Sequence, residues 1–199
     1  MKLIIVRHGE TNENIKDIMQ DKNATLSELG KIQARKVGER LKNEKIDVIY
    51  VSNLDRAVES AEEIIKHHPD VDVIYSKELR ERDLGAFEGK PIGHLLNHRK
   101  NNNLEFHTFR PKGGESPLDA QERVKKFVYG LLKKYHSKTV LLITHGALIS
   151  LFLLHLKNTQ IEIDIFRKHC PDNTGIIILE IDEDKNHKVH LLNCTKHLE

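Results

Sequence analysis

The sequence predicts an α/β fold in which strands and helices alternate along the chain. Short apolar runs end at charged or glycine-containing breaks, as expected of buried strands that stop at loops. The runs at 47–51 and 139–144 lack the alternation of a half-exposed strand, which favours burial on both faces of a parallel sheet. Strands that alternate with helices form a right-handed, doubly wound sheet. We expect six strands, at residues 2–7, 47–51, 71–75, 139–144, 175–181 and 189–193.

Helices fill most of the intervals between these runs. Ser27 is a good N-cap for a helix that runs to about residue 43. The expected apolar side of this helix carries Leu29, Ile32, Val37 and Leu41. Further helices are expected at 54–67, 116–136 and 147–157, and the polar turn at 182–187 predicts a hairpin between the last two strands. Between 89 and 114 the pattern breaks, and a connection of this length is usually functional or disordered.

The composition indicates a single domain over residues 1–199 with a highly charged surface. Because the net charge is only +2, we expect no nucleic-acid partner. The apolar stretch near the N-terminus is too short for a signal peptide, and no run approaches the roughly eighteen apolar residues of a membrane span. We therefore expect a cytoplasmic protein without a membrane partner, in which Cys170 and Cys194 are free thiols. The sequence leaves the oligomeric state open.

The many histidines raise the question of a metal site. His94 and His98 are four residues apart, a spacing that can place two ligands on one helical face. Leu95 follows His94, however, so the glutamate of a His-Glu-x-x-His site is missing. We expect neither a metal nor another cofactor.

Arg7, His8 and Gly9 directly follow the first apolar run. Ligands of open α/β sheets bind just beyond the carboxyl ends of strands. A cation, an imidazole and a residue without a Cβ at this edge would form an anion site with a built-in nucleophile, where Gly9 lets the backbone approach a ligand closely. Taken alone, the triplet equally fits a surface loop with an incidental histidine.

Three further motifs stand directly after other expected strands, and their order and spacing resemble the histidine phosphatase superfamily, the fold group that includes cofactor-dependent phosphoglycerate mutase. The resemblance extends from Lys2 to about Leu198. The segments that carry it are Arg7 to Asn14 with Thr11, Ser52 to Ala57, Leu79 to Gly89, Gly113 to Ser116 and Thr144 to Gly146. The resemblance implies three α/β/α layers around a six-stranded, mostly parallel sheet with one antiparallel edge strand. It also implies a small helical lid at about residues 90–115.

Phosphoryl transfer needs a nucleophile and groups that neutralise the phosphate oxygens. We expect His8 to be the nucleophile, because a neutral imidazole nitrogen can attack phosphorus and give a phosphohistidine. The guanidinium groups of Arg7 and Arg56 match phosphate oxygens with two parallel hydrogen bonds each. The alternative for Arg56 is a surface ion pair with Glu59 or Glu63.

Hydrogen-bond donors of other types complete the expected phosphate site. His145, at the opening of a helix, is expected to donate to a phosphate oxygen that gains charge during transfer. Asn14 is expected as a neutral donor, with Thr11 as an additional contact. These donors and the two arginines neutralise the phosphate without a metal.

The leaving oxygen also needs a proton, and Glu81 is the expected donor. It begins the loop after the third strand, where a partly desolvated carboxyl keeps its proton more readily. The resemblance also favours Glu81, since its place in Leu-Arg-Glu-Arg-x-x-Gly matches the acid of the family. Glu88 and Glu10 are the rival carboxylates.

The segments around the site favour a phosphatase over a mutase. Mutases of this family resemble Glu-Arg-His-Tyr-Gly at the acid loop and carry a longer insertion with paired arginines. This chain has Glu81-Arg82-Asp83-Leu84-Gly85 and a short lid without an Arg-Arg pair, which leaves water able to reach a phosphohistidine. We expect a metal-independent phosphatase. Phosphoglycerate mutase activity and a non-catalytic phosphate-binding module remain the alternatives.

The expected substrate is a small phosphorylated metabolite. α-Ribazole phosphate, phosphoglycerates, phosphoserine and fructose 2,6-bisphosphate are all compatible with the motifs. Six side chains in and beside the lid either recognise a second anionic group or form a solvated cationic loop: Arg82, His98, Arg99, Lys100, Arg110 and Lys112.

Overall fold

The computed structural model describes residues 1–199, and its centre is one six-stranded sheet. The strands are β1 (Lys2–Arg7), β2 (Val48–Ser52), β3 (Val73–Ser76), β4 (Thr139–Thr144), β5 (Ile176–Ile181) and β6 (His187–Cys194). Their order across the sheet is β3-β2-β4-β1-β5-β6. The pairs among β1 to β4 are parallel, whereas β5 is antiparallel to both of its neighbours. The expected mostly parallel sheet is confirmed, with its antiparallel strand one position in from the edge.

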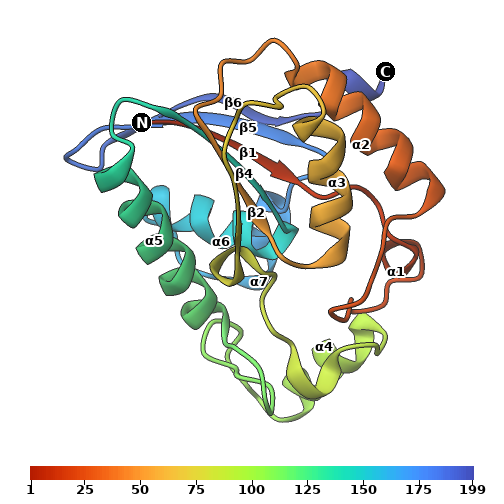
Figure 1. Cartoon of the computed structure of the whole chain (residues 1–199). Helices are drawn as coiled ribbons and strands as arrows, with labels where there is room; N and C mark the ends of the chain where they lie inside the picture. Colours follow the sequence, from red (N-terminus) through yellow and green to blue (C-terminus); the bar gives the residue numbers. More distant parts are fainter.

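Both faces of the sheet are buried at β1, β2 and β4, whereas most of β6 is exposed. In β1, Leu3 and Ile5 belong to one hydrophobic cluster, whereas Ile4 and Val6 belong to another. Because successive side chains of a strand point to opposite faces, these two clusters are the two cores of a three-layer structure. One core packs under α2 (Glu28–Leu41) and α3 (Asp55–Ile65), and the other under α5 (Pro117–Lys134) and α6 (Gly146–Leu156) (Figure 1).

The expected helices are present, with ends that differ by one to two residues. Ser27 caps α2 as expected, since its hydroxyl accepts a hydrogen bond from the Gly30 N–H at 3.0 Å. The expected apolar side of this helix is only half right. Val37 and Leu41 are fully buried, but Leu29 is 51% exposed and Ile32 is 43% exposed because the buried stripe of α2 runs through Gly30, Ala34, Val37 and Leu41 and leaves both outside it.

The segment expected as a lid contains the helix α4 (Ile92–Asn101), which lies apart from the sheet (Figure 1). Its start is joined to the loop that follows α1 (Asn12–Ile15), because Met19 donates to the carbonyl of Lys90 and Ile92 donates to that of Asp17, both at 2.9 Å. Two backbone hydrogen bonds therefore join the lid to the loop after α1. The remaining helices are α7 (Ile163–His169), η1 (Lys77–Leu79), η2 (Gly85–Phe87) and η3 (Lys196–Leu198).

Cys170 and Cys194 are both unpaired. None of the helices is of a length and apolarity that would let it cross a bilayer.

Candidate active site

Two histidines meet at the carboxyl edge of the sheet. Arg7, the last residue of β1, pairs with Thr144, the last residue of β4, so His8 and His145 follow at the same level. Their ring centroids are 5.1 Å apart. His8 is 2% exposed and His145 is fully buried. The parallel register thus brings together two side chains that are far apart in the sequence.

The hydrogen bonding of His8 fixes which nitrogen is available for reaction. Its Nδ1 lies 2.7 Å from the carbonyl oxygen of Gly9 and must be the donor, since a carbonyl only accepts. Burial, together with the charges of Arg56 and Arg7, holds the pKa of His8 well below its usual range. A neutral imidazole with its proton on Nδ1 carries a lone pair on Nε2. That lone pair is what a nucleophile needs.

Beside the histidines, Arg56 is 1% exposed and Arg7 is half-buried, and neither guanidinium has a carboxylate at ion-pair distance. Arg7 donates from Nη1 to the carbonyl of Pro171 at 2.7 Å, and Arg56 donates from Nη1 to that of Asp21 at 2.9 Å. In both residues Nε is buried and has no hydrogen-bond partner. Burial lowers the pKa of both groups. The expected alternative for Arg56, a surface ion pair, is excluded.

His145 also has an unsatisfied nitrogen. Its Nε2 lies 2.7 Å from the hydroxyl oxygen of Ser52, and its buried Nδ1 has no partner. Burial and the charge of Arg56 hold the pKa of His145 well below its usual range. Buried polar groups are normally hydrogen-bonded. Three unsatisfied nitrogens, on Arg7, Arg56 and His145, therefore indicate that something other than protein pairs with them.

Glu81 lies against the first turn of α6. Its Oε2 accepts a hydrogen bond from the Ala147 N–H at 3.0 Å, and its Oε1 accepts bonds from the N–H groups of Leu148 at 3.2 Å and Arg82 at 2.8 Å. Glu81 also lines the cavity that contains His8. The rival carboxylates do not line this cavity.

Each rival carboxylate has other neighbours. Glu10 accepts a hydrogen bond from the Ser27 hydroxyl at 2.8 Å. Glu88 lines the adjacent cavity, where burial and the nearby Asp83 raise its pKa.

Asn14 reaches the cavity, but two expected contacts do not. The Oδ1 of Asn14 accepts from the Thr11 N–H at 3.1 Å and from Asn173 Nδ2 at 3.4 Å, which leaves the Asn14 amide nitrogen for the cavity. Thr11 is fully buried as the N-cap of α1, where its hydroxyl accepts a hydrogen bond from the Asn14 N–H at 3.2 Å, so a capping role takes the place of its expected substrate contact. Gly9 is away from the lining, and a Cβ on it would lie 2.6 Å from the carbonyl of Gly30. Its missing side chain serves packing against α2.

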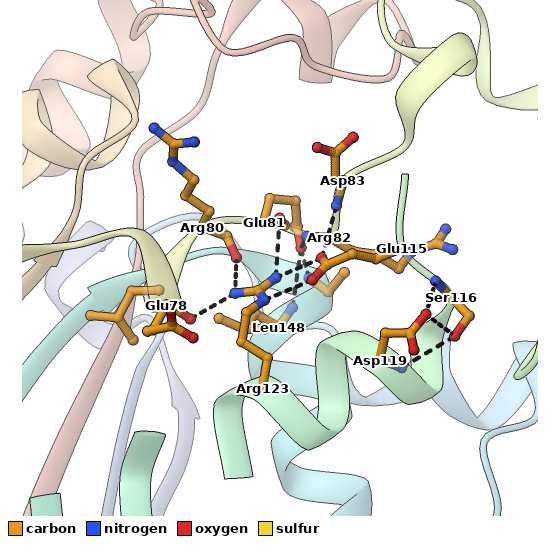
Figure 2. Close-up of polar contacts among 12 residues, drawn as sticks. Glu78, Arg80, Glu81, Arg82, Asp83, Glu115, Ser116, Asp119, Arg123 and Leu148 are labelled. Atoms are coloured by element: carbon orange, nitrogen blue, oxygen red, sulfur yellow. Dashed lines mark hydrogen bonds and ion pairs between the residues drawn. The ribbon is translucent and has the colours of Figure 1, made fainter. Parts of the chain in front are cut away.

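A network that the sequence analysis did not identify holds the acid loop (Figure 2). Arg123 of α5 donates to the carbonyls of Glu78 at 2.6 Å and Arg80 at 3.0 Å, and to that of Glu81 at 3.4 Å. It also forms a two-pronged pair with Glu115, whose Oε2 accepts from the Asp83 N–H at 3.2 Å. Arg123 and Glu115 thus fix the backbone on both sides of Glu81. Only the Gly-Gly-Glu-Ser motif at 113–116 signalled this network in the sequence.

The candidate lid cations are mostly remote from the cavity. Arg82 alone lines it, and burial lowers the pKa of this side chain. Arg99 donates to the carbonyl of Leu104, and Arg110 pairs with Asp119 at 2.7 Å. The other three do not line the cavity either: His98, Lys100 and Lys112. His98, Lys100, Arg110 and Lys112 are exposed, whereas Arg99 is half-buried with its guanidinium carbon 5.3 Å from the centre of the Phe106 ring.

No group of three or more His, Cys, Asp or Glu side chains is placed to hold a metal ion. His94 and His98 both lie on α4 and are exposed.

Comparisons with known proteins agree with this geometry. The family model described as the histidine phosphatase superfamily (branch 1) matches residues 3–195. Fructose-2,6-bisphosphatase TIGAR B of Danio rerio is 34% identical over 153 residues, which are 74% of this chain and 57% of that protein. The chain therefore spans just over half the length of this relative. Phosphoserine phosphatase 1 of Hydrogenobacter thermophilus is 28% identical over 100% of this chain and 94% of its own.

Among solved structures, Bacillus stearothermophilus YhfR matches with a TM-score of 0.88 at 27% identity, covering 100% of this chain and 99% of that chain. The similar proteins also include a 2,3-bisphosphoglycerate-dependent phosphoglycerate mutase of Bartonella bacilliformis.

Proposed function

This chain belongs to the histidine phosphatase superfamily, and from its site we propose that it hydrolyses the phosphomonoester of a small metabolite through a phosphohistidine at His8, without a metal. One observation carries the proposal: three buried nitrogens on Arg7, Arg56 and His145 lack partners around a buried histidine with a free lone pair. A phosphate dianion supplies the acceptors that all three lack.

In the first step, the Nε2 lone pair of His8 attacks phosphorus, and the bond from phosphorus to the ester oxygen breaks. The departing oxygen takes a proton from Glu81, so an alcohol leaves and His8 carries the phosphoryl group. In the second step, Glu81 accepts a proton from water as the water oxygen attacks phosphorus. Inorganic phosphate leaves, the lone pair returns to His8, and Glu81 is again protonated.

Glu81 has one oxygen position free to carry that proton. Its oxygens accept three hydrogen bonds from backbone N–H groups, two at Oε1 and one at Oε2. A carboxyl group has about four acceptor positions, so one position on Oε2 is left. We infer that the proton resides on Oε2 when Glu81 acts as the acid.

Ser52 sets the tautomer of His145 in this scheme. A neutral His145 has one ring proton, and that proton must be on Nδ1 to reach a phosphate oxygen. Nε2 is then an acceptor, so the Ser52 hydroxyl donates to it across 2.7 Å. Ser52 is a positioning residue that acts through His145.

Hydrolysis is favoured over transfer to a second substrate. The acid loop lacks the His-Tyr pair of the mutases, and none of the lid cations except Arg82 lines the cavity. No cluster of cations lines the cavity to retain a phosphoglycerate beside the phosphohistidine.

We also propose that residues 1–199 act as one domain with the lid at about 90–115, and that the protein is cytoplasmic.

Trapping of the intermediate tests the proposal. Acid-labile phosphate should appear on the wild-type protein during turnover of a labelled aryl phosphate and be absent from His8→Asn. His68→Asn is a matched control, because His68 is also buried but lies in the turn after α3, outside the cavity lining. It should retain both label and turnover. Label on a serine, aspartate or cysteine, or binding of phosphate without turnover, would contradict the proposal.

Metal independence has its own test. Turnover should be unchanged after dialysis against EDTA, because the neutralising charges belong to Arg7 and Arg56. Activity that disappears in EDTA and returns with Mg²⁺ or Zn²⁺ would contradict it.

A further inference from the structure

The cavity at His8 has two chemically different ends. It measures about 300 Å³, and one end is formed by the polar groups Arg7, His8, Asn14 and Glu81. The rest of its wall is mainly apolar. Side chains from three separate segments contribute to that wall: Ile18 and Met19 after α1, Ile92 and Leu96 of the lid, and Ile163 and Phe166 of α7. A phosphate held at His8 thus points its ester group toward hydrocarbon.

An adjacent cavity of about 360 Å³ has the opposite character. Its wall includes Arg56 and Glu81 but neither Arg7 nor His8, and only one of its lining residues is hydrophobic. Its lysines and arginines are matched in number by carboxylates, so the wall has no formal net charge. A polyanionic leaving group would gain little there.

Charged groups are scarce on the apolar side of the His8 cavity. Beyond the catalytic groups, only Arg82 and Arg167 contribute. Arg167 is exposed in the last turn of α7. Arg82 is 8% exposed, and its guanidinium carbon lies 5.9 Å from the centre of the Phe106 ring. This arginine is the only buried cation that could meet a carboxylate of the substrate.

We propose, on the basis of the proposed function, that the alcohol part of the substrate is an apolar group of about five carbon atoms, aliphatic or aromatic, rather than a sugar phosphate or a carboxylate. A cavity of about 300 Å³ holds roughly ten water-sized groups. The phosphate occupies about half of them, which leaves space for about five carbons. A longer chain emerges past Ile92, which is 39% exposed at the rim.

A series of n-alkyl phosphates tests this directly. Ethyl, butyl, hexyl and octyl phosphate share one type of leaving oxygen, so the series changes only the apolar length. We expect kcat/KM to rise about twofold to fourfold for each methylene that becomes buried, and to level off near hexyl phosphate. Hexyl phosphate should also exceed 3-phosphoglycerate and phosphoserine by at least about tenfold.

A variant of the lid tests whether the preference for longer alkyl chains arises from the apolar wall of the cavity. Ile92→Ser should lower kcat/KM for hexyl phosphate by about threefold to tenfold and leave ethyl phosphate within about twofold. Ile32→Ser is the matched control, because Ile32 has a similar exposure of 43% but lies on α2, outside the cavity. It should change neither substrate.

Binding of non-hydrolysable alkylphosphonates separates this inference from the proposed function. Hexylphosphonate should bind more tightly than ethylphosphonate in calorimetry whether or not the protein turns over phosphomonoesters. If no phosphomonoester is hydrolysed but this preference is present, the proposed function fails and the inference about the ligand stands. A flat or falling series, or a preference for phosphoglycerate that Arg82→Met abolishes, would overturn the inference.

Discussion

Replacing Glu81 by glutamine should slow alkyl phosphates far more than aryl phosphates. Alkoxide leaving groups need a proton in the transition state, and a general acid contributes about 100- to 10,000-fold. Aryl oxides are already stable anions and need little protonation. We therefore expect Glu81→Gln to lower kcat/KM for hexyl phosphate by at least about 100-fold more than for p-nitrophenyl phosphate.

The structure also predicts a second cost of this substitution. Glutamine can place its oxygen where Oε1 accepts from Leu148 and Arg82, but its NH₂ group then faces the Ala147 N–H. Two donors facing each other leave the N–H unsatisfied, which costs about 1–3 kcal/mol. This cost corresponds to a loss of about fivefold to 150-fold if it falls on the transition state, and it applies to both substrates equally. The ratio of the two losses, and not either loss alone, measures acid catalysis.

The assay compares the two substrates in three proteins. Glu88→Gln is the matched control, because Glu88 lines the adjacent cavity and should change both rates by less than about threefold. Equal losses for both substrates in Glu81→Gln would assign Glu81 a binding or structural role. A selective loss in Glu88→Gln would identify Glu88 as the acid and refute the reasoning.

Two further predictions concern the histidine and the acid loop. Burial lowers the pKa of His8, so His8 stays neutral to a lower pH than an ordinary histidine. Activity should fall when His8 gains a proton. We therefore expect the acid limb of the kcat/KM profile to lie below about pH 6.5. An acid limb at or above that value, measured with buffers of constant ionic strength, would contradict the burial argument. Arg123→Met leaves Glu115 and three backbone carbonyls without their donor, so the free energy of unfolding measured in urea should fall by about 3 kcal/mol. Arg110→Met breaks an exposed ion pair and should lower it by less than about 1 kcal/mol. Equal losses in the two variants would show that the network does not hold the loop.

The parts of the site that the sequence could predict are those fixed by strand ends. His8 and His145 follow uninterrupted apolar runs, and parallel pairing of β1 and β4 places both at one edge. Their partners depend on pairs that are distant in the chain. The bond between Ser52 and His145 spans 93 residues, and that between Arg123 and Arg80 spans 43. No local periodicity encodes such pairs.

Other deviations have local causes. Thr11 stands three residues before Asn14, and the two form a capping box that closes α1. That spacing was visible in the sequence, and it predicts a helix cap equally well as a phosphate contact. Gly9 similarly permits any close approach, and only the fold shows that the approaching group is the backbone of Gly30. A motif therefore predicts where a residue lies more reliably than which neighbour it contacts.

The unsatisfied groups around His8 oppose stability and favour binding for the same reason. Arg7 and Arg56 keep their charges under burial that lowers their pKa, and each Nε lacks a partner. Buried charge without a counter-charge is unfavourable, so the free protein retains a cost that a bound dianion removes. Burial, together with the same two cations, keeps His8 and His145 neutral before the phosphate arrives by lowering the pKa of each. Pairing either arginine with a carboxylate would stabilise the free protein, but it would also raise the pKa of His8 and occupy the donors that the phosphate needs. The cations can therefore serve both nucleophile and phosphate only while they remain unpaired.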